Sequence, residues 1–111
     1  MCANFKPITA TQVKQLGLPA IPFTYQPEVF PSFEMPLLFN AQKSLEWRLV
    51  NFGLIPKWAE DKEAGKHTYN ARNETLIEKR SFTEALSKCQ FGVIPVTEFY
   101  ESKYVNGKPQ R

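Results

Sequence analysis

The sequence predicts an α+β fold of short strands and small helices, in a single domain spanning residues 1–111. The chain has 111 residues, of which 42% are hydrophobic and 14% aromatic, so it can bury a core of its own. Its 9 prolines and 5 glycines argue against a helix bundle, because proline breaks helices and suits short strands joined by irregular segments. Both helix-like and strand-like patterns occur along the chain.

The first half of the chain contains one predicted helix and one predicted strand. In TATQVKQLGL, we expect Thr11 to cap a short helix that ends at Gly17. Residues 19–36 carry a proline every few positions, so this segment should be extended, irregular and laid over other elements. In LEWRLVNFG, apolar Leu45 and Trp47 alternate with charged residues, which is typical of a half-buried strand.

The second half is predicted to hold a helix, two strands and a tight turn. SFTEAL has the pattern of a capping box, with Ser81 as the cap and Glu84 three residues later. FGVIPV is a short apolar strand, and EFYESKY is a second strand. Asn106-Gly107 indicates a two-residue hairpin turn, since both positions of such a turn need positive φ.

The end of the chain leaves this hairpin short. Four residues follow Gly107, and one of them is Pro109, so we expect no return strand to pair with residues 98–104. The strand before the turn would then leave an open edge. We therefore expect the chain to be a fragment of a longer protein that continues past Arg111. The alternative is a natural short protein with a frayed tail.

Charge and composition exclude several classes of protein. The formal net charge of +3 at pH 7 is compatible with a polyanionic partner, but it is far from the basic signature of a dedicated nucleic-acid binder. No apolar run approaches the roughly 18 residues that a membrane helix needs. With 1 His and 2 Cys, the chain has no zinc-ligand spacing, and we expect no metal and no cofactor. The expected location is cytoplasmic, with the nucleoid as the site in a bacterium.

The opening MCANF places one of the two cysteines directly after the initiator Met. Removal of Met1 would leave Cys2 with a free α-amine beside its own thiol, and this 1,2-aminothiol reacts readily with aldehydes. The same five residues also fit an ordinary start followed by a Cys at a frayed terminus. A disulfide between Cys2 and Cys89 stays open, although nothing in the sequence favours it.

Polar and charged residues gather in the stretch YNARNETLIEKRSF. Asn70, Arg72, Glu74, Lys79 and Arg80 fall within eleven positions. On charge alone, this stretch is a solvated polar turn that leads into a helix. Its interpretation changes when it is taken together with the other motifs of the chain.

Four motifs occur in order along the chain. They are MC at the start, FGLIPKW at 52–58, NARNETLIEKRSF at 70–82 and CQFGVIPVTEFYE at 89–101. Together they resemble the SOS-response-associated peptidase (SRAP) family, whose members sense abasic sites in single-stranded DNA. The resemblance is specific because four separated motifs match at suitable spacing. It implies a barrel-like, mainly antiparallel sheet with small peripheral helices.

The chain departs from the usual motifs of that family at several positions. Ala3 and Asn4 stand where Gly and Arg are usual, and the change at Asn4 removes a candidate phosphate contact. The other replacements are Phe52 for Trp, Thr97 for Asp, Glu98 for Gly and Ser102 for Trp. The family's second half, with its His-x-Arg-Met-Pro motif, has no counterpart here, and His67 does not correspond to that His.

The resemblance implies covalent capture of abasic sites, with a peptidase-like capacity for self-processing. An abasic sugar is in equilibrium with an open-chain aldehyde. Cys2, freed of Met1, would attack it through its amine, which is partly neutral near pH 7, and the thiol would then close a thiazolidine ring. Glu101 matches the family's catalytic Glu and would transfer protons. Asn70 would orient the Cys2 terminus or the opened sugar through its amide.

The resemblance also implies residues that contact the DNA. Arg72 would bind a phosphate beside the lesion, and Arg80 is a second candidate for a phosphate contact. Trp58 would stack on a neighbouring base, with core packing as the alternative. Cys89 is expected at the start of a buried strand as a small hydrophobic residue. Four aromatic residues are expected in the core: Trp47, Phe52, Phe82 and Phe91.

The predicted partner is single-stranded DNA that contains abasic sites, and the chain is expected to be a monomer that uses no membrane and no metal. Two other functions stay open. One is a non-catalytic single-stranded DNA-binding module, or an inactive fragment of such a protein, which the missing second half and Asn4 favour. The other is a thiol peptidase, which would need a Cys–His pair, and His67 is its only candidate.

Overall fold

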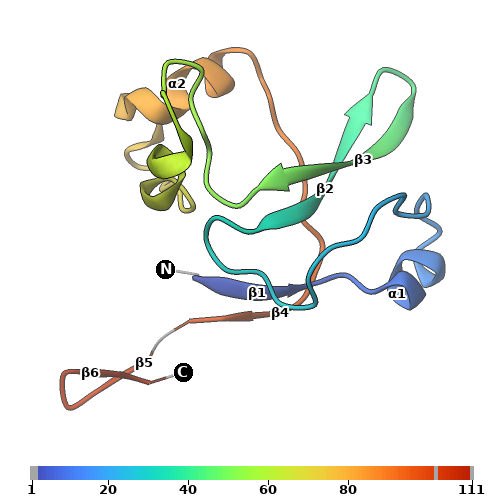
Figure 1. The fold of residues 1–111 in the computed structure, drawn as a ribbon, viewed down its shortest axis with the longest axis horizontal. Helices are drawn as coiled ribbons and strands as arrows, with labels where there is room; N and C mark the ends of the chain where they lie inside the picture. Colours follow the sequence, from blue (N-terminus) through green and yellow to red (C-terminus); the bar gives the residue numbers. More distant parts are fainter. Residues whose placement is uncertain (1–2, 102, 111) are drawn as a thin grey trace.

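The computed structural model describes residues 3–101 and 103–110 as short strands, α-helices and 3-10 turns (Figure 1). In chain order the elements are β1 (Asn4–Pro7), α1 (Ala10–Gln15), β2 (Glu34–Ala41), β3 (Ser44–Asn51), η1 (Lys62–His67), η2 (Leu76–Glu78), α2 (Arg80–Ser87), β4 (Val96–Tyr100), β5 (Lys103–Val105) and β6 (Lys108–Gln110). Antiparallel strands with few helices confirm the α+β prediction.

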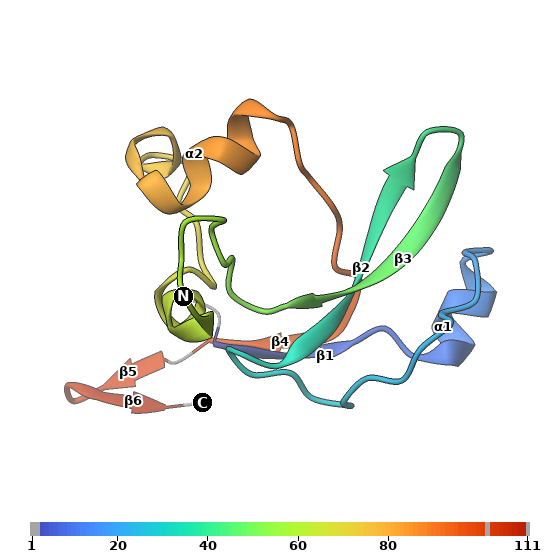
Figure 2. The ribbon, with the colours of Figure 1, turned by 45° about the horizontal axis from the view of Figure 1, so that its top comes forward.

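The strands of the described residues form three antiparallel pairs, β1 with β4, β2 with β3 and β5 with β6. Isolated bridges from Phe5 to Val29 and from Leu38 to Val93 connect two of these pairs to other segments. Figure 2 shows the β2–β3 hairpin rising on one side of the β1–β4 pair and α2 standing on the other. The chain therefore curves without closing, and the expected barrel-like sheet is not confirmed among these residues.

The β1–β4 pair joins two segments that are far apart in the sequence. Asn4 lies opposite Tyr100 and Phe5 opposite Phe99, so the start of β1 meets the end of β4. On its other edge, β1 exchanges two hydrogen bonds with Val29, where Phe5 N donates to Val29 O at 3.1 Å and Val29 N donates to Phe5 O at 2.8 Å. β1 is thus held from both sides, because its backbone groups find partners on each edge.

Two small hydrophobic clusters form the core. One contains Ile8, Val13, Leu38 and Trp47, and the other contains Phe5, Val29 and Phe52. The prediction that Trp47 and Phe52 are core residues is confirmed, and Phe82 is half-buried. The prediction for Phe91 is wrong, since 66% of its surface is exposed. Phe91 follows the end of α2 in the connection to β4, which forms no regular strand before Val96, and no second layer covers its side chain.

The proline-rich segment lies over other elements, as predicted. The Trp47 indole Nε1 donates a hydrogen bond to Pro19 O at 2.7 Å, and the Tyr25 hydroxyl donates to Ile8 O. The segment ends earlier than expected, because β2 includes the fully buried Pro36. The backbone N–H of Leu38, two residues after Pro36, faces the edge of β2 that lies away from β3, and it donates a hydrogen bond to Val93 O. Pro36 has no N–H to donate, so this edge is where a strand tolerates it.

Both helices begin differently from the prediction. The cap of α1 is Thr9 rather than Thr11, because the Thr9 hydroxyl accepts from Gln12 N while the Gln12 side chain accepts from Thr9 N. Gly17 follows the helix at φ +68°, in the conformation that glycine adopts most easily. The capping box at Ser81 is wrong, since α2 begins at Arg80 with no side-chain cap.

The segment between α2 and β4 also differs from the prediction. Cys89 is exposed and has φ +52°, so it ends the turn after α2 and does not begin a buried strand. Within FGVIPV, Val93 forms an isolated bridge, and regular pairing starts only at Val96. Pro95 and the mostly exposed side chains of this run leave it as an extended connection rather than a strand.

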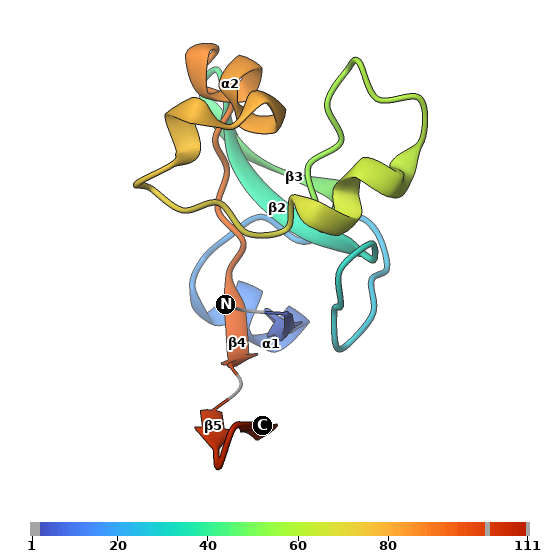
Figure 3. The ribbon, with the colours of Figure 1, turned by 90° about the vertical axis from the view of Figure 1, so that its left-hand side faces the viewer.

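The predicted turn at Asn106-Gly107 is confirmed, with φ values of +52° and +76°. The expected absence of a return strand is wrong, because β6 pairs with β5 from Lys103 opposite Gln110 to Val105 opposite Lys108. Tyr100 pairs with β1 instead, so β4 and β5 have different partners. Figure 3 shows this small hairpin projecting beyond the end of β4.

Candidate functional site

The predicted site residues that the structure describes line two adjoining cavities that share Thr68 and Asn70. We call the first, of about 590 Å³, the apolar bowl; apolar side chains such as Phe5, Phe52 and Phe99 line it, with Asn70 and Glu101 among its polar residues. We call the second, of about 640 Å³, the cationic cavity; its charged and aromatic lining includes Trp58, His67, Arg72, Lys79 and Arg80.

Glu101 reaches the apolar bowl because of the β1–β4 pairing. It directly follows Tyr100, the last residue of β4, and its side chain is exposed. Phe99, two residues earlier, lines the same bowl and is 63% exposed. A carboxylate beside apolar walls, with solvent access, can accept and return protons to a molecule held in the bowl.

Asn70 is positioned by a close contact between two backbone segments. Thr68 is buried, and its hydroxyl donates to Leu54 O at 2.6 Å and to Ala64 O at 3.2 Å. Tyr69 packs edge-on against Phe52, with ring centres 5.7 Å apart. These contacts fix the backbone on the N-terminal side of Asn70, whose side chain is half-buried and lines both cavities.

Gly53 allows this close contact. Its φ is +125°, and a Cβ built there would lie 2.1 Å from Gly65 O. No side chain fits between the two segments, because real Cβ atoms never approach a carbonyl oxygen so closely. The glycine in the FGLIPKW motif therefore sets how near η1 lies to the strand end at Asn51.

The cationic cavity gathers basic side chains from three segments. His67 comes from the end of η1, Arg72 from the following loop, and Lys79 and Arg80 from the start of α2. Among the described residues that line this cavity, none is acidic. Sequence reasoning selected Arg72 and Arg80 but not Lys79 or His67. Both could have been selected from the sequence, because Lys79 directly precedes Arg80 and His67 is the single His of the chain.

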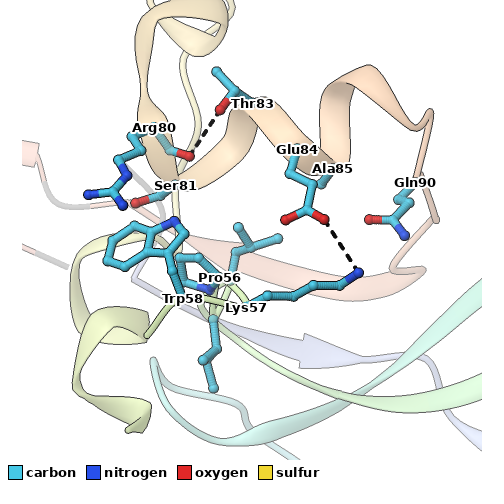
Figure 4. Close-up of a pocket in the computed structure, with 11 residues that line it drawn as sticks. Pro56, Lys57, Trp58, Arg80, Ser81, Thr83, Glu84, Ala85 and Gln90 are labelled. Carbon is cyan, nitrogen blue, oxygen red and sulfur yellow. Dashed lines mark hydrogen bonds and ion pairs between the residues drawn. The ribbon is translucent and has the colours of Figure 1, made fainter. Parts of the chain in front are cut away.

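Trp58 and Arg80 form a stacked pair at the edge of the cationic cavity (Figure 4). The guanidinium carbon of Arg80 lies 4.2 Å from the centre of the Trp58 ring. Trp58 is 49% exposed, so its surroundings are not those of a core residue. Its stacking on a DNA base stays a prediction, and the geometry offers an exposed aromatic ring beside a fixed cation.

The start of β1 lies at the same end of the sheet as Glu101. Asn4 is buried, and its Nδ2 donates to the Glu28 carboxylate at 2.6 Å. Its side chain is thus engaged in the fold, whereas the usual Arg was expected to contact a phosphate. Cys2 and Ser102 lie outside the described residues.

A charged cluster on the β1–β4 pair stabilises this register. The Tyr100 hydroxyl donates to Glu98 Oε2 at 2.7 Å, and Lys6 Nζ lies 3.7 Å from the same oxygen. The hydrogen bond from Tyr100 and the charge of Lys6 lower the pKa of the Glu98 carboxyl, and Tyr100 and Glu98 raise the pKa of Lys6. Glu98, which replaces the usual Gly, therefore pairs across the strands and does not disturb them.

Two absences bear on the possible chemistry. Among the residues that the structure describes, no three His, Cys, Asp or Glu side chains are placed to hold a metal ion. Nor is any helix in that part of the chain long and apolar enough to cross a membrane. The thiol of Cys89 is exposed, and it is not among the residues that line either cavity.

The fold and these motifs place the chain in a known protein family. The sequence model of the family described as SOS response associated peptidase (SRAP) matches residues 3–111, and the chain belongs to this family. The chain also resembles a crystal structure of a protein from Bordetella bronchiseptica, with a TM-score of 0.82 and 23% identity, over 97% of this chain and 54% of the other. That likeness shows the fold.

Several relatives carry the name abasic site processing protein. YoaM of Bacillus subtilis is 36% identical over 88 residues, which cover 76% of this chain and 37% of YoaM. YoqW of Bacillus phage SPbeta is 38% identical over 82 residues, covering 72% of this chain and 35% of YoqW. HMCES of Pongo abelii is 37% identical over 65 residues, covering 56% of this chain and 18% of HMCES. The chain thus spans about a third of the length of its bacterial and phage relatives.

Proposed function

We propose that this chain processes abasic sites in DNA, and that it does so by covalent capture through Cys2 in single-stranded DNA. The proposal is supported by membership of the SRAP family and by relatives that are named abasic site processing proteins. A cytoplasmic location, near the nucleoid in a bacterium, and action as a monomer belong to the same proposal.

The observation that carries the proposal is the pairing of β1 with β4. It brings the start of β1 to the end of β4, where Glu101 enters the apolar bowl beside Asn70. Cys2 precedes Asn4 by two peptide units, which span at most about 7 Å. Covalent connection therefore tethers the proposed nucleophile to the end of the sheet where the proposed acid–base group lies.

The proposed chemistry uses both reactive groups of Cys2 after Met1 is removed. The α-amine attacks the aldehyde carbon of the opened sugar, and loss of water gives an imine. The thiol sulfur then adds to the imine carbon, and its proton passes to the nitrogen, which closes a five-membered thiazolidine. Glu101 delivers and accepts protons in the imine step. Asn70 holds the opened sugar by a hydrogen bond, which favours ring closure through proximity.

The cationic cavity would hold the DNA backbone beside the lesion. Arg72 and Arg80 present guanidinium groups that can grip a phosphate by two hydrogen bonds. Trp58 offers an exposed ring on which an unpaired base can stack whatever its sequence. A single strand fits this combination because stacking on a side chain needs a base that is free of its own neighbours.

The direct test is covalent capture of an abasic oligonucleotide. A uracil-containing single strand, treated with uracil glycosylase, is incubated with protein whose Met1 has been removed, and a denaturing gel shows the conjugate. We expect a heat-stable shift that Cys2→Ala and Cys2→Ser abolish. Cys89→Ala is the matched control and should leave the shift intact. A conjugate that survives Cys2→Ala but disappears with Cys89→Ala would overturn the assigned nucleophile.

A second function, a non-catalytic single-stranded DNA-binding module, is favoured by the described lining of the cationic cavity, because Arg72 and Trp58 could hold a strand there without a covalent bond. Protein that binds a strand carrying a tetrahydrofuran abasic analogue, but never shifts an authentic abasic strand, would establish this module. The family's description as a peptidase also suggests autoproteolytic removal of Met1. Intact-mass measurement of wild type and Glu101→Gln would show whether that removal depends on the site.

A further inference from the structure

The proposed capture chemistry does not use a cavity that lies beside α2. This helix-side cavity measures about 370 Å³ and lies between residues 54–58 and α2 (Figure 4). Pro56 and Ala85 belong to its apolar lining, whereas Trp58, Lys57 and Glu84 add an aromatic ring and two opposite charges. The volume is near the lower end of the range of about 300–1,000 Å³ found for small-molecule sites. It suits one flat ring system.

We propose that the helix-side cavity binds an unpaired nucleobase of the strand that carries the abasic site, with guanine preferred. The inference rests on the proposed function, since it concerns the same DNA strand. It assigns a binding role to Lys57 and Glu84.

The position of Trp58 connects the helix-side cavity to the cationic cavity. Trp58, Arg80 and Ser81 line both, so the stacked Trp58–Arg80 pair forms the boundary between them. A strand held by Arg72 on one side of this boundary passes the indole before it reaches the other side. The base that enters the helix-side cavity is therefore a neighbour of the lesion nucleotide and not the lesion itself.

Lys57 and Glu84 present a donor and an acceptor next to each other. Lys57 Nζ lies 3.3 Å from Glu84 Oε1, and Lys88 Nζ lies 2.7 Å from the same oxygen. The hydrogen bond from Lys88 and the nearby Lys57 ammonium lower the pKa of the Glu84 carboxyl, so it accepts hydrogen bonds and does not donate them. Figure 4 shows the Lys57 amine and the Glu84 carboxylate together on one side of the space and the Trp58 ring on the other.

This donor–acceptor pair matches the Watson–Crick edge of guanine. The O6 atom of guanine accepts a hydrogen bond, as from the Lys57 ammonium, while N1–H and N2–H both donate, as to the Glu84 carboxylate. Adenine, cytosine and thymine each have one donor group on this edge, whereas guanine has two neighbouring donor groups, so guanine gains one contact with the carboxylate. The edge is accessible only in an unpaired base, because a duplex partner occupies it. Exposed ion pairs contribute little to stability, so Lys57 can shift toward a base at small cost.

The test measures binding without capture. Oligothymidine strands carrying one tetrahydrofuran abasic analogue receive a single guanine at each position around the analogue in turn, and fluorescence anisotropy gives the dissociation constant at fixed salt. We expect one position at which guanine binds about fivefold or more tightly than thymine. Hypoxanthine, which lacks the 2-amino group, should show a smaller gain at that position. Glu84→Gln should bring the guanine-to-thymine ratio to about one.

Glu78→Gln is the matched control, because it makes the same change of charge on exposed η2, and Glu78 does not line the cavity. It should keep the guanine preference, while both variants change the affinity for the all-thymine strand alike. Equal binding of guanine and thymine at every position, or a preference that persists in Glu84→Gln, overturns this inference and leaves the proposed function standing. Failure of every strand to bind, the all-thymine strand included, overturns the proposed function and the inference with it.

Discussion

Asn4 lies directly opposite Tyr100 across the antiparallel pair formed by β1 and β4. Ninety-six positions separate these residues in the sequence, and this contact decides that the amino-terminal segment and Glu101 occupy one end of the sheet. The candidate site depends on that pairing more than on any single local motif.

Glu101→Gln tests proton transfer. The change keeps the shape of the side chain and removes its ability to exchange a proton, so we expect the single-turnover rate of capture to fall by about 10²–10⁴-fold. Glu101 is exposed, so the free energy of unfolding should change little. The affinity for a strand with a tetrahydrofuran analogue should also be unchanged. A normal capture rate in this variant would remove Glu101 from the chemistry.

Arg72→Ala tests the cationic cavity. We expect weaker binding of single strands of any sequence, together with a shallower dependence of affinity on salt, because one phosphate contact and its released counterion are lost. Lys43→Ala removes the same charge at the exposed β2–β3 turn and is the matched control. Titrations at several salt concentrations compare the slopes. Equal slopes for Arg72→Ala and wild type would show that Arg72 does not touch the backbone.

Trp58→Ala tests stacking against core packing. Because Trp58 is about half exposed, the loss in unfolding free energy should be well below that of a core aromatic, which is about 3–5 kcal/mol. Binding of single-stranded DNA should weaken about fivefold or more, since base stacking on an aromatic ring contributes about 1–3 kcal/mol. Leu45→Ala, which is 45% exposed on β3, controls for loss of exposed apolar surface. Large destabilisation with unchanged DNA binding would favour a structural role.

Gly53→Ala tests the contact that positions Asn70. A methyl group at this position meets Gly65 O and requires φ of +125°, so we expect destabilisation of about 3 kcal/mol or more in urea unfolding. Gly17→Ala is the control, because Gly17 also has positive φ but nothing within 4 Å of the built Cβ. It should cost about 1–2 kcal/mol. Similar losses for both variants would mean that the approach of Gly65 exerts no constraint.

Glu98 gives the β1–β4 pair a defined dependence on pH. Its pKa is lowered in the folded chain by Tyr100 and Lys6, so its stabilising effect is present above the unfolded value of about 4.5 and is lost as the pH falls through the folded value. Glu98→Gln should lower the melting temperature near neutral pH and have a smaller effect at pH 3. The comparison is made by thermal unfolding at both pH values. An effect that is larger at pH 3 would contradict the assigned sign.

The sequence by itself determined the features that depend on local backbone preference. The alternation around Trp47 specifies β3, because every second side chain of a strand faces the core. Asn106-Gly107 specifies its turn, because both residues tolerate positive φ. Gly17 marks the end of the first helix for the same reason, although the cap two residues before the expected Thr11 was missed. The family motifs selected Asn70, Arg72, Trp58, Arg80 and Glu101, and all of them line one of the two adjoining cavities.

Only the tertiary structure decided which distant segments meet. No local signal states that β4 pairs with β1, since strand partners are chosen by the burial of faces that come together after folding. His67 and Lys79 join the cationic cavity through tertiary placement, which local propensities do not encode. The contact of Gly53 with Gly65 places η1, and the packing of α2 places Lys79. The exposure of Phe91 and Cys89 has the same origin, because an apolar residue is buried only where another layer of the fold covers it.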